Sequence, residues 1–162
     1  NTRFNLRREA ADRSVAPDRL VFARKIEKAE HLSRLKWADL ALDTRIVNGH
    51  TTTSDSLWAG VPVIALQGRH FASRVSSSIL HAVGLPELVT HRVEEYEKLA
   101  VQLASRSSEL KAIRHKLNIN RLEKSLFATA RFVRNLENAY SEMWRIFLEG
   151  RTPMQIEVFE VQ

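Results

Sequence analysis

The chain lacks cysteine altogether, and its 162 residues include only five glycines and four prolines. Without thiols, it has no disulfide bonds, cysteine nucleophiles or thiolate metal sites. No apolar run approaches the roughly 18 residues that a membrane-spanning helix needs, so no membrane partner is expected. The sequence also lacks an acidic cluster or a set of histidines with metal-ligand spacing, so neither a metal nor another cofactor is expected.

The composition that remains is typical of a soluble globular domain with a hydrophobic core, with 44% hydrophobic and 27% charged residues. The net charge of +6 indicates either an ordinary solvated surface or a positive field that attracts an anionic ligand. Nucleic acid is not an expected partner, because no aromatic-interleaved basic run, zinc-finger spacing or RNA-binding signature is present. The first residue is Asn1 rather than Met, and no signal peptide is visible, so we expect a piece of a longer, cytoplasmic protein.

The most informative stretch is 40–66, with the sequence LALDTRIVNGHTTTSDSLWAGVPVIAL. It predicts an apolar strand, a loop, a short helix and a second apolar strand. Asp43 ends the first strand, and Asn48-Gly49 predicts a turn that uses the backbone freedom of glycine. Gly60 is expected to end the helix.

Four hydroxyl residues, Thr51, Thr52, Thr53 and Ser54, open the predicted helix, and Asp55 is expected in its first turn. Each hydroxyl is able to cap a helix, so one interpretation is simply a well-capped helix. The alternative is an anion site, most often for phosphate, because a helix N-terminus presents unpaired N–H groups and a positive dipole end. The stretch is neither a P-loop nor a GxGxxG fingerprint.

Short apolar runs alternate with helical patterns along the rest of the chain. Strands are predicted at 20–22, 40–42, 63–66 and 88–89, and helices at 5–13, 28–37, 71–83, 94–105, from 107, and at 130–148. This alternation predicts an α/β domain with a Rossmann-like parallel sheet and crossover helices. Ligands are expected beyond the carboxyl ends of its strands. The long last helix carries a broad apolar stripe formed by Phe132, Val133, Leu136, Tyr140, Met143, Trp144 and Phe147.

Few side chains carry a chemical signal. Lys28, His31 and Arg34, spaced by three on a predicted helix, form either a solvated face or a cationic edge for a nucleotide. His50 is either a turn histidine or a donor to a phosphate oxygen, and Asp55 is either a helix acid or an acceptor for ribose hydroxyls. No nucleophile–base pair or close carboxylate pair is present, so no catalytic residue is predicted.

The segments that carry these signals resemble the C-terminal half of the catalytic region of the O-GlcNAc transferases, inverting glycosyltransferases built from two facing Rossmann-like domains. The resemblance runs from about residue 5 to residue 150, with order and spacing kept throughout. The strongest segments are RLVF (19–22), KAEHLSR (28–34), ADLALDT (38–44), NGHTTTSDSLWAGVPV (48–63), FASRVSSSIL (71–80), GLPELV (84–89) and ENAYSEMW (137–144).

The resemblance implies that the anion site is a UDP-sugar site. In the family a lysine, a histidine and an arginine on one helix contact the ribose and uracil, and Lys28, His31 and Arg34 match them. The backbone near Ile26 is then expected beside the uracil edge.

Four further residues match the family's diphosphate and ribose contacts. His50, Thr51 and Thr52 match the turn that holds the diphosphate, and Asp55 matches the acid that accepts ribose hydroxyls. Donors at a helix N-terminus stabilise the charge of a departing UDP without a metal, which agrees with the pattern read from the residues alone.

The implied function is that of the donor lobe of a metal-independent protein O-linked N-acetylglucosaminyltransferase, which uses UDP-GlcNAc and acts on Ser or Thr of proteins. The family's upstream lobe, its acceptor-binding tetratricopeptide repeats and its proton-transfer residues lie outside this chain. The fragment alone is therefore expected to be inactive. We expect 1–150 to form the nucleotide-sugar-binding lobe and 151–162 a C-terminal tail.

Two departures from the family's sequence pattern leave the identity of the donor sugar open. Residues 45–47, Arg-Ile-Val, replace a more aromatic, proline-containing loop, and Gln67 stands where a proline is common. Both border the expected sugar pocket, and a related transferase that uses GDP-fucose has the same architecture. A non-catalytic module that binds a nucleotide or a partner protein, the latter through the apolar stripe of the last helix, remains the alternative.

Overall fold

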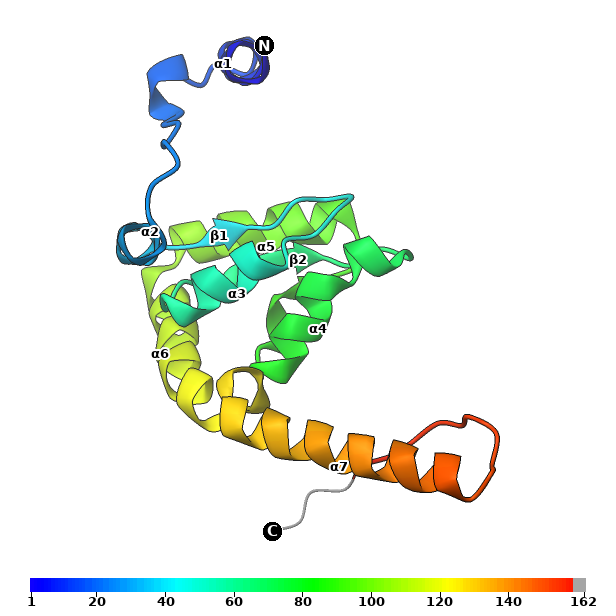
Figure 1. Ribbon diagram of the computed structural model, residues 1–162. Helices are drawn as coiled ribbons and strands as arrows, with labels where there is room; N and C mark the ends of the chain where they lie inside the picture. The colour runs from blue at the N-terminus through cyan, green and yellow to red at the C-terminus, as the bar shows by residue number, and fades with distance from the viewer. Residues whose placement is uncertain (159–162) are drawn as a thin grey trace. The chain divides into compact units, whose positions relative to one another are not determined.

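The computed structural model describes residues 1–158 (Figure 1). The chain divides into two compact units, Asn1–His31 and Leu32–Gln162. The first unit holds α1 (Thr2–Asp12), a 3-10 helix (Pro17–Arg19) and the start of α2 (Lys28–Leu35). The helices predicted near 5–13 and 28–37 are therefore confirmed, with bounds shifted by a few residues.

The strand predicted at 20–22 is wrong. These residues belong to no helix or strand, and Val21 is 88% exposed. Phe22 instead lies beneath two guanidinium groups, those of Arg3 and Arg7, each 5.5 Å from its ring centroid. A three-residue apolar run forms a strand only where another strand pairs with it, and residues 20–22 take no part in the sheet that the described residues form.

Three short parallel strands form the sheet within residues 32–158, in the order β1-β2-β3. They are β1 (Ala41–Leu42), β2 (Val63–Leu66) and β3 (Val89–Thr90). Ala41 pairs with Val63, and Ala65 pairs with Val89. The fold class predicted from the sequence, a parallel sheet with crossover helices, is confirmed.

The central strand is buried because its sequence, VIAL, is apolar on both faces, as in most parallel sheets. The edge strand differs: its short apolar sequence predicts a place in a buried sheet, which is wrong for Leu42 of β1, because that side chain is 57% exposed. The last strand begins one residue later than predicted, at Val89.

Each crossover in the sheet contains a helix. The first is α3 (Thr51–Trp58), and the second combines a 3-10 helix (Phe71–Ser73) with α4 (Val75–Ala82). The single helix predicted at 71–83 is thus divided, because the hydroxyl of Ser73 bonds back to the main chain of His70 and closes a separate turn. As predicted, Gly60 follows α3, in a left-handed conformation with φ of 83°.

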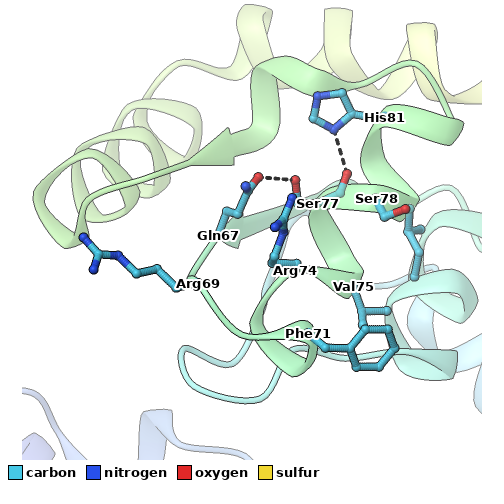
Figure 2. A pocket seen from close by; sticks show the side chains of 9 residues that line it. Gln67, Arg69, Phe71, Arg74, Val75, Ser77, Ser78 and His81 are labelled. Carbon is cyan, nitrogen blue, oxygen red and sulfur yellow. Dashed lines mark hydrogen bonds between the residues drawn. The ribbon is translucent and has the colours of Figure 1, made fainter.

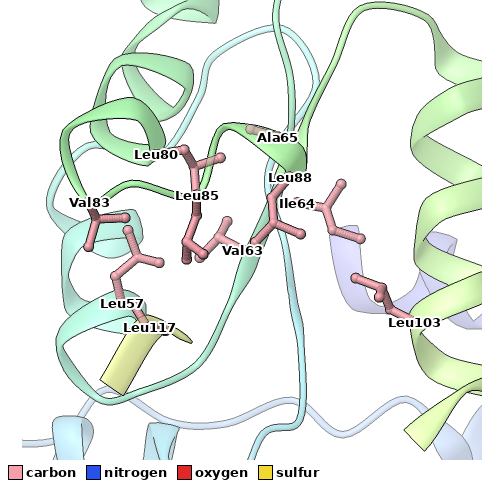
Figure 3. Close-up of a cluster of buried hydrophobic side chains, with 10 residues drawn as sticks. All are labelled: Leu57, Val63, Ile64, Ala65, Leu80, Val83, Leu85, Leu88, Leu103 and Leu117. Atoms are coloured by element: carbon pink, nitrogen blue, oxygen red, sulfur yellow. The ribbon is translucent and has the colours of Figure 1, made fainter. Parts of the chain in front are cut away.

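Helices cover both faces of the sheet (Figures 1 and 3). Leu57 of α3 and Val63 of β2 pack on one face, whereas Ile64 points toward Leu103 on the other face. This alternation follows from the two-residue period of a strand. Leu103 belongs to α5 (Val93–Ser105), which is followed by α6 (Ser107–Glu123), a 3-10 helix (Ser125–Phe127) and α7 (Thr129–Leu148).

Helix α7 is amphipathic, as its pattern predicts, but its apolar stripe is largely exposed in the described residues. Phe132, Tyr140, Trp144 and Phe147 are each 59–68% exposed, and Ile146 is buried. No helix within residues 1–158 is both long and apolar enough to cross a membrane.

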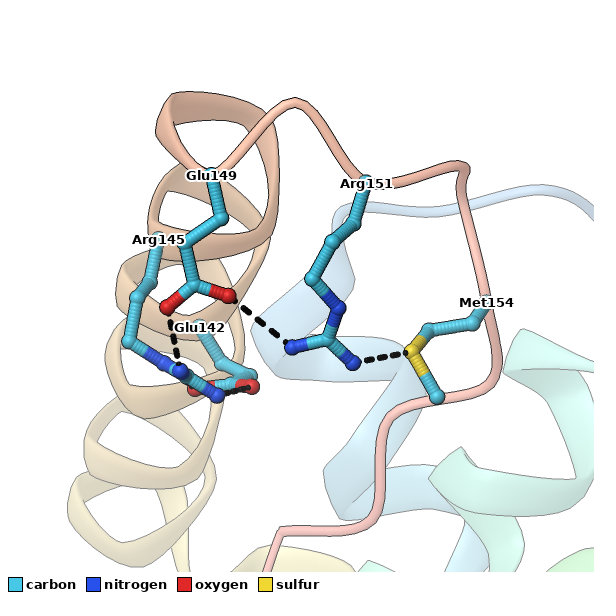
Figure 4. Close-up of polar contacts among 5 residues, drawn as sticks. All are labelled: Glu142, Arg145, Glu149, Arg151 and Met154. Carbon is cyan, nitrogen blue, oxygen red and sulfur yellow. Dashed lines mark hydrogen bonds and ion pairs between the residues drawn. The ribbon is translucent and has the colours of Figure 1, made fainter.

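The end of α7 is tied by exposed polar contacts (Figure 4). Arg145 bonds to Glu142 and Glu149 at 2.6 Å each, and Arg151 bonds to Glu149 at 3.0 Å and to the sulfur of Met154 at 2.9 Å. Exposed ion pairs of this kind contribute little stability individually. They hold the first residues of the tail against the helix.

Candidate functional site

The N-terminus of α3 lies where the chain returns from the carboxyl end of β1. His50 is the N-cap residue, and the first intrahelical bond runs from the N–H of Ser54 to the carbonyl of His50. The N–H groups of Thr51, Thr52 and Thr53 precede that bond and have no intrahelical acceptor. These N–H groups lie at the helix end where the sequence predicts an anion.

Capping by the helix's own hydroxyl groups, the simpler sequence interpretation, is wrong for α3. No side chain makes a capping hydrogen bond at His50. The hydroxyl of Thr53 donates instead to the carbonyl of Gly49 at 3.1 Å. Thr51 and Thr52 are exposed side chains at the helix end.

Gly49, directly before His50, is held through both its N–H and its carbonyl by side chains from the loop after β1, from α3 and from α4. Its N–H donates to Oδ1 of Asp43 at 2.7 Å. Its carbonyl accepts from Thr53 of α3 at 3.1 Å and from Ser76 of α4 at 2.9 Å. The hydroxyl groups of Thr53 and Ser76 also lie 2.8 Å apart. This network fixes the chain that enters the site.

The loop before Gly49 is similarly fixed. The main-chain N–H of Asn48 donates to the carbonyl of Ala72 at 2.8 Å, and its side-chain amide donates to the carbonyl of Thr44 at 3.0 Å. Within residues 1–158, two buried oxygens in this loop have no hydrogen-bond partner, Oδ2 of Asp43 and Oδ1 of Asn48. A buried oxygen without a hydrogen-bond partner costs free energy, so these two atoms offset part of the stability that the loop's other hydrogen bonds supply.

Gly49 is required for space rather than for backbone freedom, which corrects the sequence prediction. Its φ is not positive, unlike that of Gly60. A Cβ atom at position 49 would lie 2.5 Å from the hydroxyl oxygens of both Thr52 and Thr53. Only glycine therefore lets the loop approach the first turn of α3 this closely.

The structure brings four of the predicted site residues together at the start of α3. His50, Thr51 and Thr52 are exposed, and His50 contacts the ring of Phe71 edge-on at 6.2 Å between centroids. Asp55 is half-buried and lies in the second turn of α3, so its predicted place in the first turn is wrong.

The remaining three predicted residues lie on α2. Lys28 is exposed, whereas His31 and Arg34 are half-buried. Lys28 and His31 belong to the first unit and Arg34 to the second, so the geometry of the site rests on the α3 residues. Contact of the α2 residues with a nucleotide stays a prediction.

A pocket of about 870 Å³ opens beside the carboxyl end of β2 (Figure 2). Arg69, Arg74 and His81 line it, and none of its nine lining residues is acidic. Its wall is ordered by a 2.6 Å bond from the hydroxyl of Ser77 to the side-chain carbonyl of Gln67. Phe71 lines the same pocket, so the pocket adjoins His50.

The sequence interpretation missed the residues that shape the site rather than those that face a ligand. Asp43 appears there only as the end of a strand. Arg74 and Ser76 lie within the matching segment 71–80 but receive no role, and Arg69 lies outside the matching segments. Asp43 follows a strand and precedes a glycine turn, which is a weak signal for a loop-holding carboxylate. Within residues 1–158, no group of three or more His, Asp or Glu side chains is arranged to hold a metal ion.

A parallel sheet with a polar helix N-terminus at its carboxyl edge occurs in many nucleotide-binding proteins, so fold alone does not decide the family. Residues 2–136 match the sequence profile of Glycosyl transferase family 41. The chain belongs to this family.

Curated relatives agree with membership of family 41. The chain is 42% identical over 158 residues, 97% of its length, to "Probable UDP-N-acetylglucosamine--peptide N-acetylglucosaminyltransferase SEC" of Arabidopsis thaliana. It is 36% identical over 146 residues to "UDP-N-acetylglucosamine--peptide N-acetylglucosaminyltransferase" of Caenorhabditis elegans. The alignments cover 90% of this chain in the second case, but only 16% and 13% of the two relatives.

A solved structure gives the same result for the fold. A mutant of the Thermobaculum terrenum O-GlcNAc transferase superposes with a TM-score of 0.81 at 36% sequence identity. The match covers 89% of this chain and 28% of that one. The resemblance to the O-GlcNAc transferases is thus confirmed, and the chain corresponds to a part of the family 41 glycosyltransferases.

Proposed function

We propose that this chain is the donor-binding lobe of a protein O-linked N-acetylglucosaminyltransferase, which binds UDP-GlcNAc and serves transfer of the sugar to Ser or Thr of proteins. The observation that carries the proposal is the N-terminus of α3, where exposed His50, Thr51 and Thr52 accompany N–H groups without intrahelical acceptors. The names of the relatives support the choice of UDP-GlcNAc as donor and of a polypeptide as acceptor.

The chemistry needs what this helix end supplies. When the glycosidic bond of the donor breaks, negative charge develops on the UDP that leaves. N–H groups, threonine hydroxyls and an imidazole at a fixed helix end stabilise that charge without needing to reorganise. The proposal therefore includes a metal-independent reaction, and chelation by EDTA is expected to leave UDP affinity unchanged.

The nucleoside is assigned to the remaining predicted residues. Lys28, His31 and Arg34 hold the uracil and ribose, and Asp55 accepts ribose hydroxyls. The acceptor protein binds through parts of the relatives that lie outside this chain, which covers about a sixth of the Arabidopsis protein. Transfer itself is assigned to the longer cytoplasmic protein.

The direct test is calorimetric titration of the chain with UDP, with GDP as the control nucleotide. UDP-selective binding is expected, and His50→Ala and Asp55→Ala are each expected to weaken it by about tenfold, the effect of losing one hydrogen bond to a charged group. His115→Ala removes an exposed histidine of α6 and serves as the matched control.

Two results would contradict the proposal. Equal affinity for UDP and GDP would remove the uracil assignment and favour a donor with another base. Unchanged UDP affinity in both His50→Ala and Asp55→Ala would place the nucleotide away from α3.

A further inference from the structure

Asp43 connects the end of β1 to the loop that enters the candidate diphosphate site. One carboxylate oxygen, Oδ1, accepts two main-chain N–H groups, from Thr44 at 2.8 Å and from Gly49 at 2.7 Å. The main-chain carbonyl of Asp43 accepts the hydroxyl of Tyr96, from α5, at 2.9 Å. Both the main chain and the side chain of Asp43 are therefore held in place.

The bond to Gly49 determines which donors remain for a ligand. Because the N–H of Gly49 points to Asp43, it is not available to an anion at the end of α3. The Gly49 carbonyl is held on the opposite side by Thr53 and Ser76. With the peptide units on both sides of the Gly49 Cα atom fixed, the next residue, His50, and the N–H groups of α3 without intrahelical acceptors keep one orientation.

The charge of the Asp43 carboxylate is unfavourable at this position unless its hydrogen bonds compensate for it. A carboxylate in a loop that leads to a diphosphate site repels the ligand, so charge alone would favour a neutral residue here. Its second oxygen is buried without a partner in residues 1–158, which adds a further cost. Two charge-assisted hydrogen bonds to main-chain N–H groups are the compensating gain.

We infer that Asp43 is a positioning residue for the diphosphate of the donor: it holds the N–H of Gly49 so that His50 and the first N–H groups of α3 face the phosphates. This inference rests on the proposed function. It predicts that losing Asp43 weakens binding of the phosphates and leaves binding of the nucleoside alone unchanged.

Substitutions at position 43 separate this role from general stability. Asp43→Ala removes the acceptor. Asp43→Asn keeps an acceptor oxygen, but its neutral hydrogen bonds are about half as strong. Asp39→Asn is the matched control, because Asp39 is an exposed acid four residues earlier, before β1.

The first measurement is the affinity of each variant for UDP and for uridine. Asp43→Ala is expected to lose about tenfold or more in UDP affinity, with uridine affinity within about twofold of the unaltered chain. Asp43→Asn is expected to lie between the two, and Asp39→Asn to match the unaltered chain. Equal losses for UDP and uridine, or no loss for either, would overturn the inference.

The second measurement needs no ligand: hydrogen exchange at the Gly49 N–H, followed by NMR. Exchange is expected to accelerate about tenfold in Asp43→Ala, because the bond that protects this N–H is lost. If Asp43→Ala does not fold, Asp43→Asn provides the same test, and a smaller acceleration of exchange at the Gly49 N–H is expected. Unchanged exchange at Gly49 would overturn the inference, whether or not UDP binds. Absence of UDP binding to the unaltered chain with protected Gly49 would instead count against the proposed function.

Discussion

The hydroxyl groups of Thr53 and Ser76 lie 2.8 Å apart, and each also lies within hydrogen-bonding distance of the Gly49 carbonyl. This contact joins α3 to α4, the helices of the two successive crossovers. Two hydroxyl groups carry only two hydrogens for three short contacts, so at most two of the contacts are hydrogen bonds at any moment. The carbonyl of Gly49 therefore has a second donor whenever one hydroxyl turns away.

This redundancy predicts non-additive mutations. Thr53→Val and Ser76→Ala are each expected to lower the free energy of unfolding by about 1 kcal/mol, because the Gly49 carbonyl keeps one donor. The double variant is expected to lose more than the sum, because the carbonyl then loses both donors. Urea unfolding of the four proteins measures the coupling. Simple additivity would show that each hydroxyl acts alone.

Gly49→Ala is expected to destabilise the chain by about 1–3 kcal/mol, the usual cost of overpacking. Its new methyl group would lie 2.5 Å from the Thr52 and Thr53 hydroxyl oxygens, so the entrance to α3 must shift. The same shift is expected to weaken UDP binding. Urea unfolding and titration with UDP measure the two effects.

Gly150→Ala provides the contrast for that prediction. Gly150 has a positive φ of 64°, but a Cβ there would meet nothing within 4 Å. Its substitution is expected to cost about 1–2 kcal/mol through backbone strain alone and to leave UDP affinity unaltered. A loss of affinity in Gly150→Ala as large as in Gly49→Ala would mean that the steric explanation is wrong.

Burial predicts very different losses of unfolding free energy when two apolar side chains are truncated to alanine. Leu57, a member of the buried cluster, is fully buried, whereas Phe147 of α7 is 68% exposed. Leu57→Ala is expected to lose about 2–5 kcal/mol of unfolding free energy, and Phe147→Ala about 0.5 kcal/mol or less. Chemical unfolding distinguishes them. A large loss in Phe147→Ala would show that the exposed stripe of α7 packs on itself or on another copy in solution.

Much of the fold follows from local pattern. The apolar run of β2 and the glycine after α3 each specify their structure within a few residues. The failed strand at 20–22 has equally apolar residues, but a strand also needs a neighbour, and a single sequence does not show which strands pair. The break between the 3-10 helix and α4 depends on one hydroxyl bond of Ser73, which periodicity does not reveal.

The residues of the candidate site likewise fall into two groups, those that the sequence reveals and those that only the structure reveals. The residues that face a ligand lie within one short stretch, so a motif reveals His50, Thr51 and Thr52. The residues that hold this stretch come from elsewhere: Asp43 from the end of β1 and Ser76 from α4, 27 positions after Gly49. Only the tertiary structure brings them to the two main-chain groups of one residue, Gly49.

The hydroxyl of Tyr96 makes the stability of the folded chain depend on pH in alkaline solution. Burial first, and the negative charge of Asp43 second, raise the pKa of Tyr96 above its ordinary value of 10.0. Because the folded chain then holds this proton more tightly than the unfolded chain, its contribution to stability is complete below pH 10.0 and is lost as the pH rises through the folded-state pKa.

Tyr140→Phe leaves Tyr96 as the only tyrosine, since the chain has two. Absorbance at the tyrosinate band in that variant is expected to show a midpoint above 10.0, the ordinary tyrosine value. Adding Tyr96→Phe is expected to lower the free energy of unfolding by about 1 kcal/mol at neutral pH, because the bond to the Asp43 carbonyl is lost. The same substitution is expected to flatten the fall in stability above pH 10.0. A midpoint at or below the ordinary value would mean that neither burial nor Asp43 acts on this hydroxyl, and the anchor of Asp43 on α5 would then be absent in solution.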